Sequence, residues 1–181
     1  MIITISGKAG SGKSTVAKLV AKKLKLKHYS SGDFMREIAK EHNMTLLELS
    51  ALAEKEKWVD KALDDRQISL GKIKDNFIID GRLSWHFIPN SIKIYLDVTP
   101  EIAAKRIYGD KKNENRKNEG FTSQNDIIQK IKERTNSEKK RYKKYYNLDY
   151  HSKKHYDLVI DTSKITPEKV VEKIISFQKN K

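Results

Sequence analysis

The sequence of 181 residues contains no cysteine. This absence excludes a scaffold held by disulfides and any zinc site built from thiolates, and it fits a reducing compartment. No apolar run approaches the ~18 residues that a membrane-spanning helix needs. The few apolar residues before Gly7 are also too short for the hydrophobic region of a secretory signal. We therefore expect a cytoplasmic protein that has no membrane partner.

Arginine is scarce as well, because it supplies only seven of the 38 basic residues. The formal net charge is nevertheless +14. Such a charge fits either a nucleic-acid-binding protein or a pocket for polyanionic small molecules, and composition does not separate the two. Arginine recognises phosphate through a planar, bidentate fork, whereas lysine is a flexible point charge. The positions of the few arginines are therefore informative.

Short apolar runs alternate with amphipathic segments along the whole chain. The runs typical of buried strands are 2–6, 27–31, 76–81, 92–97 and 156–162. The segments with helical spacing are 13–24, 32–42, 46–52, 59–70 (ending near Gly71), a stretch from 99, 125–146 and a stretch from 166. Thr45 and Glu48 form a capping-box pattern before the third of these helices. This alternation predicts a single α/β domain, residues 1–181, with a mostly parallel sheet flanked by helices.

A phosphate-binding motif follows the first predicted strand. Gly7, Gly12, Lys13 and Ser14 match the pattern G-x-x-x-x-G-K-[ST] between a strand and a helix, which is the required context. Backbone N–H groups of such a loop form a concave anion site at the positive end of the helix dipole. Lys13 can reach the β- and γ-phosphates, and the Ser14 hydroxyl can bind Mg²⁺. The motif predicts the fold of P-loop-containing nucleoside triphosphate hydrolases, but ATPases, GTPases and small-molecule kinases share it.

Two arginines follow predicted strands at the same edge of the sheet. Arg36 comes just after Asp33 at the start of the second helix, and Arg82 follows Asp80 and Gly81 at the end of the third predicted strand. Ligands of open α/β sheets bind at this carboxyl edge. Asp80 is placed to orient Mg²⁺ and its waters, and each arginine is a candidate clamp for a second anion.

These segments together resemble the nucleoside monophosphate (NMP) kinases, most closely the cytidylate kinases of the archaeal type. The resemblance covers nearly the whole chain. It depends on GKAGSGKST, SSGDFMREIAKEH, VDKALDDRQ, IIDGRLSW, IKIYLDVTPEIAAKRI, ERTNSEKKRYKKYYNLD and YDLVIDTS. It implies transfer of the ATP γ-phosphoryl group to CMP or dCMP, which gives ADP and CDP or dCDP, with Mg²⁺ as the cofactor.

The resemblance also implies a role for individual residues. The ATP-binding residues are Gly7, Lys8, Ala9, Gly10, Ser11, Gly12, Lys13, Ser14, Thr15 and Arg106. The NMP-binding residues are Asp33, Arg36, Asp64, Arg66, Gly81 and Arg82. The catalytic residues are Lys13, Arg82, Arg134 and Arg141, and the Mg²⁺ residues are Ser14 and Asp80, the latter through waters. Arg134 and Arg141 are seven positions apart, which is two helical turns, and therefore share one face of a helix.

The same resemblance divides the domain into a core, an NMP-binding helical insert and a lid. The core is 1–33, 72–108 and 125–181, the insert is about 34–71, and the lid is about 109–124. The family places a further arginine soon after Arg106, where this chain has Gly109 followed by Asp110 and Lys111. Arg116 is a candidate substitute, and a plain surface loop is the alternative for the whole polar stretch.

Other interpretations remain open at this point. The acceptor could be AMP, UMP or a small hydroxylated metabolite. Four charged residues could either contact a cytosine edge or form an exposed helix face with intrahelical ion pairs: Asp60, Asp64, Asp65 and Arg66. The stretch 139–156 interleaves lysines with tyrosines, a pattern that RNA-binding surfaces use, although such tyrosines also pack in cores. The five histidines show no metal-ligand spacing. We expect a monomer that needs no nucleic acid.

Overall fold

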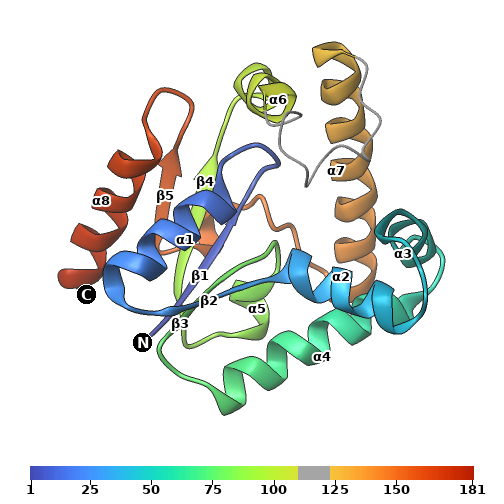
Figure 1. The fold of residues 1–181 in the computed structure, drawn as a ribbon, viewed down its shortest axis with the longest axis horizontal. Helices are drawn as coiled ribbons and strands as arrows, with labels where there is room; N and C mark the ends of the chain where they lie inside the picture. The colour runs from blue at the N-terminus through green and yellow to red at the C-terminus, as the bar shows by residue number, and fades with distance from the viewer. Residues whose placement is uncertain (110–122) are drawn as a thin grey trace.

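The computed structural model describes residues 1–109 and 123–181. Its centre is a sheet of five parallel strands in the order β2-β3-β1-β4-β5 (Figure 1). The strands are β1 (Ile2–Gly7), β2 (Lys27–Ser30), β3 (Phe77–Asp80), β4 (Ile92–Asp97) and β5 (Leu158–Asp161). The predicted α/β fold with a parallel sheet is therefore confirmed.

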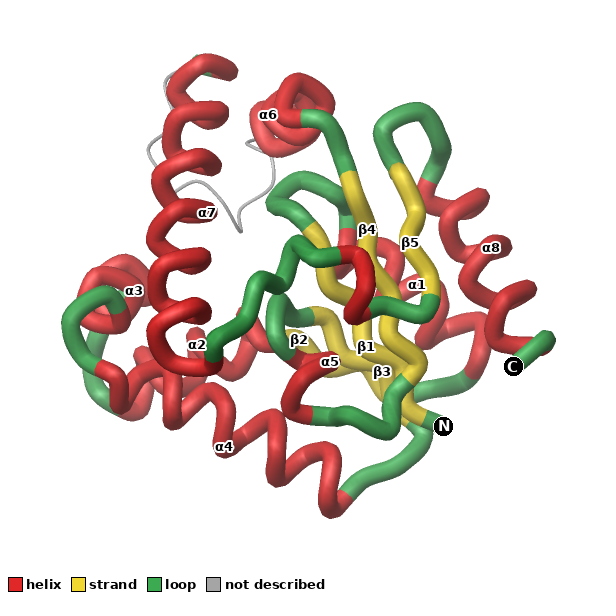
Figure 2. Tube along the Cα trace, turned by 180° about the vertical axis from the view of Figure 1, so that it is seen from behind, coloured by secondary structure: helices red, strands yellow, loops and turns green. Residues whose placement is uncertain are grey.

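Helices cover both faces of this sheet. They are α1 (Lys13–Leu24), α2 (Ser31–Glu41), α3 (Leu46–Ala53), α4 (Lys57–Ile73), α5 (Ser84–Phe87), α6 (Pro100–Gly109), α7 (Gln124–Tyr146) and α8 (Pro167–Lys179), with a 3-10 turn at Lys153–His155. Successive side chains of a strand point to opposite faces. Ile78 of β3 thus joins the core under α1 and α8, whereas Phe77 and Ile79 pack with Ile88 behind α5. Figure 2 shows α5 on the face opposite α1 and α8.

The strand register brings the functional segments to one edge. Ile5 of β1 is the neighbour of Asp80, Asp80 is the neighbour of Ser30 on β2, and Gly7 is the neighbour of Leu96 on β4. All five strands run in parallel, so their carboxyl ends meet at the same side of the sheet. The loop after β1 and the segment after β3 therefore emerge next to each other.

Helices α2, α3 and α4 pack on one another beside the sheet and have an apolar cluster of their own. Ile38, Leu49 and Val59 are fully buried in it, one from each helix. The predicted capping box is confirmed, because Glu48 N donates to Thr45 Oγ1 and the Thr45 N–H donates to the Glu48 carboxylate. The division of the chain into core, insert and lid stays a prediction, since residues 110–122 of the proposed lid, including Arg116, lie outside the described residues.

Helix α7 runs alongside the sheet from α6 to the α2–α4 group (Figure 1). At one end Ile127 packs with Ala104 and Ile107 of α6. The helix ends at Tyr146, because Asn147 adopts a left-handed conformation (φ 55°) and caps it with an N–H bond to the Lys143 carbonyl. A single 23-residue helix thus touches both the core and the α2–α4 group.

Two local expectations need correction. Gly71 does not end the fourth helix, which continues to Ile73; a Cβ at Gly71 would approach Ile88 to 3.0 Å, so the glycine permits close packing there. The short helix α5 was not predicted, because a four-residue segment is too short to show a helical repeat. Within the described residues, no helix combines the length and apolarity needed to cross a membrane.

The two outer glycines of the P-loop should differ sharply when each is changed to alanine. Both have positive φ, but a Cβ on Gly7 would lie 2.1 Å from the carbonyl oxygen of Leu96 inside the sheet, whereas a Cβ on Gly12 would have no atom within 4 Å. We expect Gly12→Ala to lower the free energy of unfolding by about 1 kcal/mol and Gly7→Ala by about 3 kcal/mol or more. Urea denaturation of both variants measures the difference, and equal losses would contradict it.

Candidate active site

The loop between β1 and α1 has the geometry of an anion site. Gly7, Gly10 and Gly12 have φ values of 144°, 74° and 84°, which L residues rarely adopt. Helix α1 begins at Lys13 with no acidic residue in its first turn, so its positive end is open to an anion. The Lys13 ammonium donates to the carbonyls of Gly7 (3.0 Å) and Lys8 (2.8 Å). Burial and the neighbouring Arg82 lower the pKa of Lys13 to about 7.

Asp80 is the hub of a hydrogen-bond network at the base of this loop. Its carboxylate accepts from Ser14 Oγ (2.7 Å) and Ser30 Oγ (3.2 Å), and His28 Nε2 lies 2.7 Å from its other oxygen. Burial opposes ionisation, but the hydrogen bonds from His28 and Ser14 outweigh it and lower the pKa of Asp80. His28 was not among the predicted site residues. Strand β2 pairs with β3 so that Ser30 is the neighbour of Asp80, and His28 lies two residues before Ser30 on the same strand. This pairing brings the His28 side chain to the Asp80 carboxylate.

Ser14 and Asp80 suit a magnesium ion in the kind of atoms they offer. Both present oxygen atoms, which Mg²⁺ prefers, and Asp80 is held ionised. No group of three or more His, Asp or Glu side chains able to hold a metal exists among the described residues. A magnesium ion at this place would therefore share its coordination sphere with phosphates and waters, as nucleotide-bound Mg²⁺ does.

Arg82 and Arg134 meet at one buried carboxylate, that of Glu138. Arg82 Nε lies 2.5 Å from Glu138 Oε2, and Arg134 Nε donates to Glu138 Oε1 at 3.0 Å. Glu138 is only 4% exposed, whereas the side chain of Arg134 is 62% exposed. Burial opposes ionisation of Glu138, but the two guanidinium groups outweigh it and lower the pKa of the carboxyl. Sequence reasoning missed Glu138; its place four residues after Arg134 in a basic helix was the available signal.

Arg141 binds Asp60 across the boundary between α7 and α4. Its Nη1 lies 3.3 Å and 3.2 Å from the two carboxylate oxygens, and both side chains are largely buried. Burial raises the pKa of Asp60 despite this guanidinium. One turn further along α4, the Tyr146 hydroxyl donates to the Asp64 carboxylate, and burial raises the pKa of Asp64 to about 7.

The alternative of an exposed helix face with ion pairs holds for only part of the segment 60–66. Lys61 and Asp65 form such a pair (2.5 Å) on the surface of α4. It is wrong for Asp60, which is buried, and for Asp64, which α7 covers. Arg66 faces the other way, because its guanidinium contacts Glu37 (2.9 Å) and Glu41 (2.5 Å) of α2.

Arg36 lies in the first turns of α2 and pairs with Asp33 three residues earlier. Its side chain is 59% exposed, so it is free to reorient. The N-terminus of α2 is capped by Ser30, whose hydroxyl accepts from the Gly32 N–H at 3.2 Å. Because Ser30 also donates to Asp80, the start of α2 is linked directly to the base of the P-loop.

Arg106 connects three segments on the far side of the P-loop. Its guanidinium donates to the Thr162 carbonyl (2.6 Å), to Thr162 Oγ1 (3.1 Å) and to the Gly10 carbonyl (3.4 Å). Thr162 Oγ1 in turn lies 3.2 Å from the Ser11 carbonyl. Arg106 therefore lies beside the P-loop, and its role in ATP binding stays a prediction.

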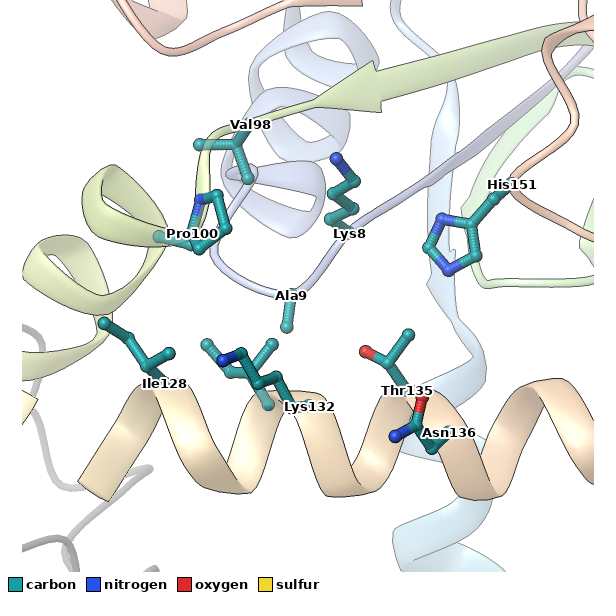
Figure 3. A pocket seen from close by; sticks show the side chains of 11 residues that line it. Lys8, Ala9, Val98, Pro100, Ile128, Lys132, Thr135, Asn136 and His151 are labelled. Atoms are coloured by element: carbon teal, nitrogen blue, oxygen red, sulfur yellow. The ribbon is translucent and has the colours of Figure 1, made fainter. Parts of the chain in front are cut away.

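Lys8 lies on the outer side of the P-loop and pairs with Asp97 at 2.7 Å. It lines a cavity of about 360 Å³ together with Ala9, Pro100, Ile131 and His151 (Figure 3). The cavity lies between the loop, the start of α6 and α7, and most of its lining is apolar. None of the candidate arginines lines this cavity, so it lies apart from the cluster of Arg82 and Arg134.

Two further residues of the predicted site lie at the ends of regular elements. Thr15 is exposed in the first turn of α1, and Gly81 directly follows β3.

Comparisons with known proteins agree with this architecture. A model of the cytidylate kinase-like family matches residues 2–164. The cytidylate kinase of Methanosphaera stadtmanae is 38% identical over 182 residues, covering 100% of this chain and 99% of that protein. The cytidylate kinase of Methanocaldococcus jannaschii is 42% identical over 169 residues, covering 91% and 89%.

A solved structure shows the same fold at much lower sequence identity. The shikimate kinase of Bacteroides thetaiotaomicron matches with a TM-score of 0.68 at 14% identity, covering 99% of this chain and 98% of that one. This likeness supports the α/β fold with a parallel sheet flanked by helices. The archaeal resemblance predicted from the motifs is confirmed by the family model and the two full-length relatives: the chain belongs to the cytidylate kinase-like family.

Proposed function

We propose that this chain is a kinase for CMP and dCMP, which transfers the γ-phosphoryl group of ATP to the acceptor and yields ADP and CDP or dCDP. The observation that carries the proposal is the convergence of Arg82 and Arg134 on Glu138, close enough to Lys13 for both arginines to disfavour its charged form. A P-loop alone needs one cationic clamp. Additional arginines at the carboxyl edge fit a second phosphate facing the first.

The donor side of the proposed reaction uses the P-loop. Its backbone N–H groups and Lys13 would hold the ATP phosphates, while Arg106 lies at the side where Thr162 and Gly10 meet. Binding requires the Lys13 ammonium to exchange its two carbonyl partners for phosphate oxygens. Ser14 and Asp80 would hold Mg²⁺ with the nucleotide; bound there, the ion supplies positive charge to the phosphate oxygens.

The acceptor side uses side chains from α2, α4 and the segment after β3. Arg36 and Arg82 would hold the acceptor phosphate, with Asp33 and Gly81 beside them. Asp64 is the better candidate of the α4 pair for contact with the base, because Arg66 contacts the carboxylates of α2 instead. AMP and UMP stay the nearest alternative acceptors.

The residues present suit this chemistry because the acceptor needs no strong general base. A phosphate monoester has its second pKa near ~6 and is already ionised at neutral pH. What the transition state requires is alignment and positive charge around the equatorial oxygens of the transferred group. Arg82 and Arg134, which pair with Glu138, and Arg141, which pairs with Asp60, would supply that charge.

RNA binding as the main role has less support. Tyr150 is buried, and its ring packs on that of Tyr142 at 5.5 Å. Tyr146 packs against Phe87 at 5.7 Å and binds Asp64 through its hydroxyl. These rings do not offer open faces for stacking on bases. A monomeric state and a cytoplasmic location stay predictions.

Removing the Lys13 ammonium should abolish phosphoryl transfer without unfolding the protein. We expect ATP turnover that depends on CMP or dCMP and exceeds turnover with UMP and AMP, and a fall of at least ~100-fold in kcat/KM for Lys13→Ala. Lys18→Ala is the matched control, since Lys18 lies on the exposed face of the same helix. Coupled ADP release over the four acceptors measures both effects. Equal turnover in the wild-type protein and Lys13→Ala would contradict the assignment.

ATP binding should take up a proton above neutral pH. The pKa of Lys13 is about 7 in the ligand-free protein, so the side chain is mostly neutral at pH 8.5, whereas the phosphates bind its charged form. We expect the affinity for ATP to fall about tenfold from pH 7 to pH 8.5, since each pKa unit of mismatch costs a factor of ten. Calorimetry in buffers of different ionisation enthalpy detects the proton. In Lys13→Met the proton uptake should vanish; uptake that persists there would refute this prediction.

Arg36→Ala should weaken the acceptor alone. The Arg36 side chain is largely exposed and contacts only Asp33 among the described residues, so its loss should leave the melting temperature within about 1 °C. The KM for CMP should rise about tenfold, the value of one hydrogen bond to a charged group, while the KM for ATP stays constant. Lys40→Ala, an exposed cation on the same helix, is the control. A rise in the KM for ATP of the same size would contradict the acceptor assignment.

A further inference from the structure

Glu138 is a buried carboxylate whose partners come from three segments of the chain. Arg82 follows β3, Arg134 lies one turn earlier on α7, and Tyr150 follows α7. Arg82 Nε and Tyr150 Oη approach Oε2 at 2.5 Å and 3.1 Å, and Arg134 Nε approaches Oε1 at 3.0 Å. Each carboxylate oxygen is therefore engaged by a guanidinium group. A carboxylate this buried persists in charged form only when it is paired in this way.

The arrangement brings together cations that would otherwise repel one another. Lys13 is electrostatically coupled to Arg82 and Arg134 at the same time, and both arginines disfavour its charged form. Charges of the same sign interact strongly where water is excluded. Glu138 and Asp80 act in the opposite sense on Lys13. One negative charge between two guanidinium groups thus permits them to occupy adjacent positions before any phosphate arrives.

The carboxylate also fixes the direction of the two side chains. Both arginines approach Glu138 at Nε, the guanidinium nitrogen nearest to the main chain, where Arg134 donates a hydrogen bond and Arg82 forms an ion pair without hydrogen-bond geometry. A guanidinium has five N–H donors, so contact at Nε leaves the donors of the terminal amino groups for another anion. Arg134 needs such a guide most, because its side chain is otherwise 62% exposed.

We infer that Glu138 is a positioning residue for phosphoryl transfer: it holds Arg82 and Arg134 with their terminal amino groups toward the transferred phosphoryl group and does not itself contact the substrates. The inference rests on the proposed function. It assigns a catalytic purpose to a buried acidic side chain that, as an anion close to a phosphate site, would otherwise only weaken phosphate binding.

Glu138→Gln tests the charge while it keeps the size of the side chain. The glutamine side chain has one oxygen that can accept from a guanidinium group. Its amino group would face the other guanidinium, so that one arginine would lose the contact that orients it. We expect kcat to fall by about 100-fold, as when one preorganised donor to the transition state is lost. The KM for ATP should change by less than about threefold, because the removed contribution acts in the transition state. The KM for CMP should rise, because Arg82 also holds the acceptor phosphate in the proposed function. A kcat within threefold of the wild type would overturn the inference.

Two further variants separate positioning from general loosening of the structure. Tyr150→Phe removes another hydrogen bond of Glu138 but keeps the carboxylate and both arginines, so it should keep kcat within about threefold. If Tyr150→Phe lowers kcat as much as Glu138→Gln does, the loss of activity comes from disturbed local packing and the inference is overturned. In a double-mutant cycle with Arg134→Lys, Glu138→Gln should cost less than in the wild-type background, since both changes affect the contact with Arg134 and only the contact with Arg82 is left to lose. Multiplicative effects would overturn the inference.

The activity of the wild-type protein shows whether a negative result contradicts the proposed function or only the role of Glu138. If the wild-type protein transfers phosphate to none of CMP, dCMP, UMP and AMP, the proposed function fails and the role of Glu138 in it fails as well. If the wild-type protein is active, with whichever acceptor, and Glu138→Gln keeps its kcat, only the inference about Glu138 fails.

Discussion

The crowding of positive charge beside the P-loop is the constraint on which the rest of the site depends. Lys13, Arg82 and Arg134 are close enough to influence one another, although like charges repel where water is excluded. Two buried carboxylates, Asp80 and Glu138, make the arrangement tolerable in the absence of substrate. A bound pair of phosphates would add the negative charge that the cluster still lacks. The ligand-free protein is thus preorganised for anions, and the free energy that this arrangement costs on folding is offset by the carboxylates.

Helix α7 connects this cluster of charges to the α2–α4 group, the part of the protein that would hold the acceptor. Along one helix, Glu138 meets the segment after β3, Arg141 meets Asp60 of α4, and Ser137 donates to Glu54 just after α3 at 2.7 Å. Of the two links to the α2–α4 group, the buried contact between Arg141 and Asp60 is the stronger, because an ion pair removed from water loses much when either partner is lost. Movement of the α2–α4 group relative to the sheet would therefore alter the position of α7 and of its arginines.

Features that depend on neighbouring residues in the sequence could be predicted from it. The P-loop, the capping box at Thr45 and the span of α1 are local patterns, and the structure has each of them. The pairing of Glu138 with Arg134 is also a local pattern. The contacts of Glu138 with Arg82 and of Asp60 with Arg141 could not be predicted in this way, because the partners are far apart in the sequence: Asp60 and Arg141 are 81 positions apart. His28 reaches Asp80 only through the order of strands in the sheet. Roles assigned to Asp64, Arg66 and the arginines stay predictions, since they concern ligands.

We propose that the donor and acceptor phosphates are held face to face beside Lys13, Arg82 and Arg134. Titration calorimetry with adenosine and cytidine joined through their 5′ positions by five phosphates tests it most directly, since such a molecule spans both sites. The account predicts one molecule per chain, at least ~100-fold tighter binding than ATP alone, and exclusion of both ATP and CMP. Binding no tighter than that of ATP, or simultaneous binding of CMP, would contradict it.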